Sequence, residues 1–231
     1  QLGDIMSLTI KSSGDFETLD KGRYAAICYQ IVDMGTTNQE YEGKVSKKKQ
    51  VRITFETTSE MMADGRPFSI NQTYTASLST MANLRKHLES WRNKNFTEEE
   101  EAGFDITNLL GCTADVEVGH TSGGNEKIIG LRYPEGGVQK VATKNEQIIF
   151  DLDVYNDEFR GKSSDETKAM CDVFADFPEW LQKDIEDSFE HKAAVDEGNA
   201  SGVTQTEAVL EDSGESLADL ASDDDEDELP F

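Results

Sequence analysis

Two charged stretches of the chain could bind a ligand of opposite charge. The basic stretch is Lys47, Lys48 and Lys49, followed by Arg52, and it is the only dense group of cations in the sequence. Cations at this density neutralise the phosphates of a nucleic acid. Tyr41, just before them, is a candidate ring for stacking on a base. A solvated hairpin would carry the same lysines, so that alternative interpretation stays open.

The acidic stretch lies at the other end of the sequence. Six consecutive Asp and Glu residues are followed there by Leu-Pro-Phe. A tail that only solubilises needs no aromatic ring beside its terminal carboxylate, whereas a ring, a carboxylate and neighbouring acids together suit an apolar pocket with a basic rim. We therefore expect a partner protein to bind Asp223, Asp224, Asp225, Glu226, Asp227, Glu228, Leu229, Pro230 and Phe231.

The net charge of −25 would normally disfavour nucleic acid as a partner. The charge is unevenly distributed, however. Residues 1–160 contain 18 Lys and Arg against 25 Asp and Glu, whereas residues 161–231 contain 4 against 22. The acidity therefore belongs mainly to the C-terminal third, and a basic face can exist in the N-terminal part.

Five segments are typical of β-strands because they are rich in β-branched and aromatic residues and are bounded by turn signals. They are 24–32, which ends at a turn signal at 33–35, then 47–58, 68–78, 113–118 and 127–133. Residues 147–155 could add one further strand or an extension. In the second segment the odd positions from Val51 to Phe55 are apolar and the even positions from Arg52 to Glu56 are polar. This period of two predicts that the apolar set faces inward and the polar set outward.

Two helices are predicted between the third and fourth strands. Met81, Leu84, Leu88 and Trp91 fall at spacings of three and four, which places them on one helix face. Ser79 or Thr80 is the expected N-cap, and residues 106–110 predict a second short helix. Trp91 is expected in the core.

The order of three strands, a helix and two strands predicts a mainly β fold, a five-stranded OB-like barrel with a capping helix. An SH3-like barrel or a β-sandwich remains an alternative. The expected organisation is an N-terminal arm (1–20), the OB-like domain (21–160), a helical extension (161–192) that Pro178 interrupts, and a disordered acidic tail (193–231) too poor in apolar residues to fold.

Two resemblances to known proteins point the same way. The acids followed by Pro230 and Phe231 resemble the C-terminal tip of bacterial single-stranded DNA-binding proteins. The stretches 21–24, 33–35, 51–56 and 83–92 look like a group of tailed-phage proteins thought to be OB-fold single-strand binders. These resemblances imply binding of single-stranded DNA by the barrel, and recruitment of replication, recombination and repair proteins by the tail.

The expected DNA-binding surface combines cations with candidate aromatic platforms. The aromatic residues on the third strand pack in a core at least as readily as they stack on bases. Beyond the Lys47–Arg52 cluster and Tyr41, the candidate DNA-binding residues are Arg66, Phe68, Tyr74, Arg92, Lys94, Lys127 and Arg132.

The sequence therefore predicts a sequence-independent binder of single-stranded DNA in phage replication or recombination, located in the cytoplasm of an infected bacterial host. We expect no enzymatic activity, no cofactor, no metal site and no membrane span. The chain could form homo-oligomers. Two alternatives stay open: an acidic DNA mimic that inhibits a host DNA-binding protein, and a protein-interaction adaptor whose barrel binds a peptide.

Overall fold

The computed structural model describes residues 17–41 and 43–212, without the side chains of Tyr41 and residues 201–212. The predicted partner-binding residues, 223–231, and most of the predicted N-terminal arm lie outside this range. The described chain forms two compact units. The first comprises the residues up to Asp33 together with Lys48–Ile149, and the second comprises Met34–Lys47 together with the residues from Phe150 onward. The expected boundary at residue 160 therefore differs from the observed division.

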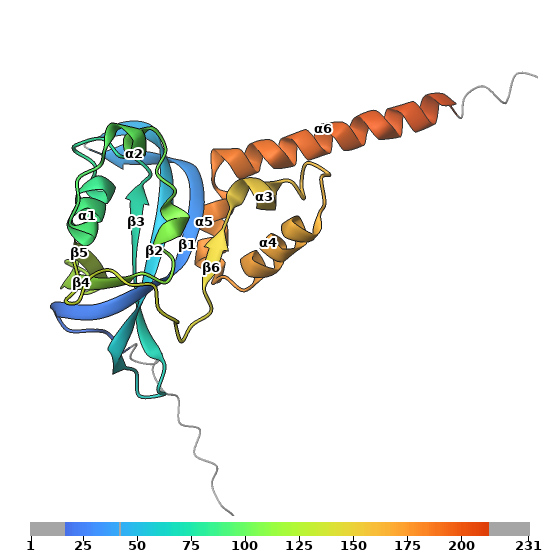
Figure 1. Cartoon of the computed structure of the whole chain (residues 1–231). Helices are drawn as coiled ribbons and strands as arrows, with labels where there is room; N and C mark the ends of the chain where they lie inside the picture. Colours follow the sequence, from blue (N-terminus) through green and yellow to red (C-terminus); the bar gives the residue numbers. More distant parts are fainter. Residues whose placement is uncertain (1–16, 42, 213–231) are drawn as a thin grey trace, which may run out of the picture. The chain divides into compact units, whose positions relative to one another are not determined.

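Six strands form a mainly antiparallel sheet with the order β3-β2-β1-β4-β5, and β6 pairs with β1 (Figure 1). The strands are β1 (Gly22–Tyr41), β2 (Lys44–Met61), β3 (Pro67–Thr75), β4 (Thr113–His120), β5 (Glu126–Arg132) and β6 (Ile148–Phe150). All five predicted segments overlap observed strands. Within the described chain no ladder joins β3 to β5, so the sheet is not closed into a barrel.

The helices follow the same chain order. They are α1 (Asn83–Arg92), α2 (Glu98–Ala102), a 3-10 turn η1 (Ile106–Leu109), α3 (Leu152–Asn156), α4 (Asp165–Ala175), α5 (Glu179–Glu186) and α6 (Phe189–Asp212). The predicted interruption at Pro178 is confirmed, because α4 ends before it and α5 begins after it. The predicted N-cap of α1 is wrong: the helix begins after Ala82, which makes no side-chain cap.

The core of the first unit lies between the sheet and α1. Leu84, Leu88 and Trp91 are buried as the helical spacing predicted. The Trp91 ring meets the Phe55 ring edge-on at 5.3 Å between centroids, and its Nε1 donates to the carbonyl of Thr113 at 2.7 Å. Met81 is the exception, since it precedes the helix and is 79% exposed.

Strand β1 does not end at the predicted turn at 33–35. It continues to Tyr41, and Gly35 accommodates the irregularity with a φ of 66°. Glycine reaches this left-handed region without the steric penalty that a side chain imposes. The segment 33–35 does need an unusual backbone conformation, which Gly35 adopts. That conformation distorts β1 locally and does not end the strand.

The polar residues of β2 were expected to face outward, and two of them do not. Thr54 and Glu56 are buried, with only 2% of Glu56 exposed. The Glu56 carboxylate accepts hydrogen bonds from the backbone N–H of Lys144 at 2.7 Å and from the backbone N–H and side-chain amide of Asn145, each at 2.8 Å. Glu56 thereby fastens the segment before β6 onto β2.

Replacing Glu56 with Gln should lower the free energy of unfolding by about 1–3 kcal/mol, because charge-assisted hydrogen bonds are lost and an amide N–H then faces other N–H donors. Chemical denaturation followed by circular dichroism measures this. Glu60→Gln is the matched control, since Glu60 is exposed on the same strand. The control should stay within about 0.5 kcal/mol of the parent protein. Equal stability of the two variants would contradict the fastening role of Glu56.

The second unit has an aromatic core. Phe150, Tyr155, Phe174 and Phe177 pack together, and the rings of Tyr155 and Phe174 stack at 4.5 Å between centroids. In this unit Thr36 of β1 donates both its backbone N–H and its hydroxyl to the carboxylate of Glu190, at 2.7 and 2.6 Å.

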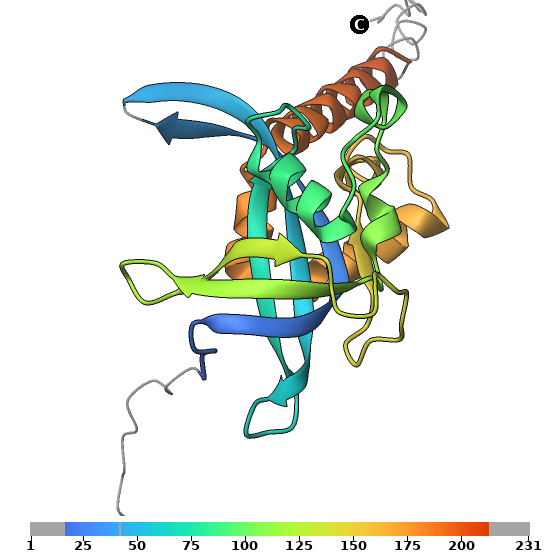
Figure 2. The same cartoon turned by 60° about the vertical axis from the view of Figure 1, so that its left-hand side comes forward.

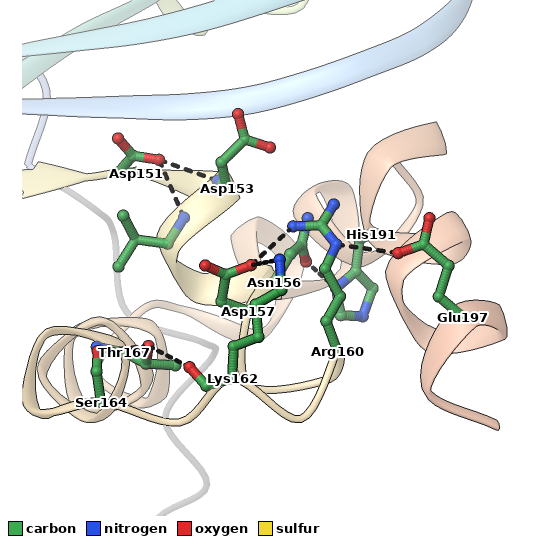
Figure 3. A network of polar contacts seen from close by, with 11 residues as sticks. Asp151, Asp153, Asn156, Asp157, Arg160, Lys162, Ser164, Thr167, His191 and Glu197 are labelled. Carbon is green, nitrogen blue, oxygen red and sulfur yellow. Dashed lines mark hydrogen bonds and ion pairs between the residues drawn. The ribbon is translucent and has the colours of Figure 1, made fainter. Parts of the chain in front are cut away.

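Polar contacts hold α6 against α3 (Figure 3). His191 Nδ1 lies 2.8 Å from Asn156 Oδ1, and both side chains are buried. Arg160 bridges Asp157 and Glu197, each at 3.2 Å. The expected disordered tail begins at residue 193, whereas the structure continues α6 to Asp212, and these contacts hold the start of that helix.

Candidate nucleic-acid interface

A pocket of about 710 Å³ lies in the first unit, lined by β2, β3, β5, α1 and the β3–α1 loop. Two exposed lysines line it, Lys48 from β2 and Lys127 from β5. Figure 2 shows the β4–β5 hairpin that carries Lys127, and α1 contacts both β3 and β5. The fold thus brings together two predicted DNA-binding cations that are far apart in the sequence.

Hydrogen-bonding and apolar side chains occupy the rest of the pocket wall. The amides of Gln50, Gln72 and Asn83 line it, together with serine and threonine hydroxyls. Met81 and Ile129 also line it and are 79% and 48% exposed. A wall with cations, amides and exposed apolar groups can contact phosphates and bases at once.

Tyr74 and His87 form a pair at this pocket. The Tyr74 ring is buried, and its hydroxyl lies 2.9 Å from Nδ1 of His87. Burial raises the pKa of Tyr74, and burial likewise lowers the pKa of His87. Because its ring packs in the core, Tyr74 presents its hydroxyl edge to this site and not a stacking face.

Three other predicted cations of the first unit have carboxylate partners. Lys49 lies 2.9 Å from Asp33, Arg66 lies 2.7 Å from Asp64, and Arg132 lies 2.6 Å from Glu117. Neighbouring charge of opposite sign reduces the attraction of such a cation for a phosphate.

Arg92 and Lys94 belong to a separate cluster. Both pair with Glu100, and the Arg92 guanidinium also lies over the rings of Phe96 and Phe104 at 4.6 and 4.9 Å. The backbone N–H of Thr97 and the two cations lower the pKa of Glu100 to about 2. Thr97 and Glu100 also form the capping box that begins α2.

The remaining candidate DNA-binding residues lie in different environments. Arg52 lies 3.5 Å from the hydroxyl of Thr73, and Phe68 is half-buried against the core. Lys47 belongs to the second unit, where its Nζ lies 3.9 Å from the centre of the Phe189 ring. The side chain of Tyr41 is outside the described residues.

Sequence reasoning missed His87, Gln72 and Ile129. A strand or helix pattern does not reveal which side chains of different elements share a pocket. His87 alone carried a usable signal, since a histidine on the rim of an apolar helix face is adjacent to both core and solvent.

No helix in the described part of the chain is long and apolar enough to cross a membrane. Residues 17–41 and 43–212 hold no group of three or more His, Cys, Asp or Glu side chains that could bind a metal ion. Comparisons with protein-family models, curated proteins and solved structures returned no match to this chain.

Proposed function

We propose that the chain is a sequence-independent single-stranded DNA-binding protein that acts in phage replication or recombination. The observation that carries the proposal is the pocket beside β3 and β5, where Lys48 and Lys127 accompany amides and the exposed side chains of Met81 and Ile129. The cations would neutralise phosphates and the apolar groups would contact bases.

The topology is compatible with this proposal. The chain order of three strands, α1 and two strands, with β1 pairing β4, fits an OB-like barrel that is open between β3 and β5. OB barrels commonly bind single strands on an outer strand face. The pocket lies at that opening, where α1 contacts both β3 and β5.

The C-terminal acids have two proposed roles. The segment from residue 223 to Phe231 would recruit replication and recombination proteins, as the resemblance to bacterial tails implies. The eight acids after Asp212 would also compete with DNA for the pocket, because tethering gives them a high effective concentration.

Fluorescence anisotropy with a labelled oligo-dT of about 30 nucleotides tests the proposal, at low and moderate salt and against a duplex of equal length. We expect salt-sensitive binding that favours the single strand. A chain cut after Asp212, which keeps α6 intact, should bind more tightly at low salt. Absence of binding by both chains would refute the proposed function, and equal binding by both would refute only the competition by the tail.

A further inference from the structure

The direction of the hydrogen bond between Tyr74 and His87 depends on the tautomer of the imidazole. Burial keeps the Tyr74 hydroxyl protonated at neutral pH, and its proton needs an acceptor. The His87 Nδ1 atom, 2.9 Å away, is the acceptor that the structure supplies. Burial also lowers the pKa of His87, which favours the neutral ring. A neutral imidazole that accepts at Nδ1 carries its hydrogen on Nε2.

The Nε2–H group of His87 is therefore an uncharged donor in a half-buried ring that lines the pocket. Nε2 has no hydrogen-bond partner among the residues described in the structure. The rings of Tyr74 and His87 also meet edge to face at 5.6 Å between centroids, so the imidazole is held in place by packing as well as by its hydrogen bond.

The two kinds of donor in the pocket suit different parts of a nucleic acid. Lys48 and Lys127 are exposed and charged, which suits phosphate oxygens in solvent. A half-buried neutral N–H donor better suits an uncharged acceptor. The exposed side chains of Met81 and Ile129 line the same pocket and can contact the apolar faces of a base.

We propose that His87 donates a hydrogen bond from Nε2 to an acceptor on the edge of a nucleobase, and that Tyr74 positions it for this contact. The proposal rests on the proposed function and deepens it. Every natural base has an acceptor on its edge, so the contact recognises a base without requiring a sequence. His87 thus distinguishes a strand that carries bases from a bare phosphate backbone.

The test compares oligo-dT of about 30 nucleotides with an abasic strand of equal length, in parallel salt titrations. His87→Phe keeps a ring and removes the donor. It should weaken oligo-dT binding about two- to tenfold, the range of one hydrogen bond. It should leave the abasic strand and the salt slope unchanged. Lys48→Gln is the matched control, and it should weaken both strands and reduce the salt slope.

Tyr74→Phe is the second variant, because it keeps the core ring and removes only the hydroxyl that fixes the tautomer. It should reproduce part of the His87→Phe loss on oligo-dT alone. Thermal unfolding checks that each variant folds. Equal losses on both strands would assign His87 to phosphate and overturn the base contact, as would unchanged binding by both folded variants. If the parent protein binds neither strand, the proposed function itself fails.

Discussion

Replacing Lys48 and Lys127 together with glutamine should weaken binding to oligo-dT on the order of 50-fold at about 50 mM salt, and should reduce the magnitude of the salt slope by about 1.4. The estimate follows from counterion release, in which each phosphate neutralised on a single strand contributes roughly 0.7 to the slope. Both lysines line the same pocket and are exposed. Anisotropy titrations at several salt concentrations measure the affinity and the slope together.

Arg66→Gln and Arg132→Gln are the controls for this experiment. Both arginines are exposed and were also candidates from the sequence, but they lie 2.7 Å from Asp64 and 2.6 Å from Glu117. We expect the paired variant of these two to stay within about threefold of the parent affinity, because the partner carboxylates already offset their charge. A larger loss in this pair than in the lysine pair would move the DNA path away from the pocket.

Gly35→Ala should lower the free energy of unfolding by about 2–4 kcal/mol. Two effects add at this position. The φ of 66° is costly for alanine, and the new Cβ would lie 2.6 Å from both Leu152 Cδ2 and Ser188 Cβ. Both neighbours are buried, so neither can move without disturbing the packing of the second unit. Urea denaturation followed by circular dichroism gives the difference.

Gly43→Ala separates the two effects. Gly43 has a similar φ of 74°, but nothing lies within 4 Å of the point that an alanine Cβ would occupy there. Gly43→Ala should therefore lower the free energy of unfolding only by the cost of the left-handed backbone conformation, about 1 kcal/mol. If Gly35→Ala costs no more than Gly43→Ala, the close packing around Gly35 contributes nothing and the prediction is wrong.

The residue pattern within one strand or helix correctly predicted burial for side chains on the face that packs against the core. The alternation in β2 correctly placed Ile53 and Phe55 inside, and the helical spacing correctly placed Leu88 and Trp91 in the core. The same alternation misplaced Glu56, because a segment almost ninety residues later covers the other face of the strand. Periodicity describes one element, whereas burial also depends on what packs against its second face.

The candidate site shows the same limit. The sequence identified Lys48 and Lys127 as candidates, and the fold places both at one pocket. It could not identify the carboxylate beside Arg132, or the histidine that joins Tyr74, because those pairings depend on strand register and helix position. Composition likewise predicted disorder from residue 193, but a few specific contacts, such as Arg160 with Glu197, order the start of α6.

The second unit combines strand residues 34–47 with the chain from Phe150 onward, which has a consequence for how the protein folds. The hydrogen bonds from Thr36 to Glu190 join residues 154 positions apart. During synthesis, this unit can be completed only after the ribosome has released Glu190 and the residues around it. Contacts of such high sequence separation close slowly, because the loop entropy is lost before the contacts form. Until then the far part of the β1–β2 hairpin lacks its helical partners, so the second unit is completed only late in synthesis.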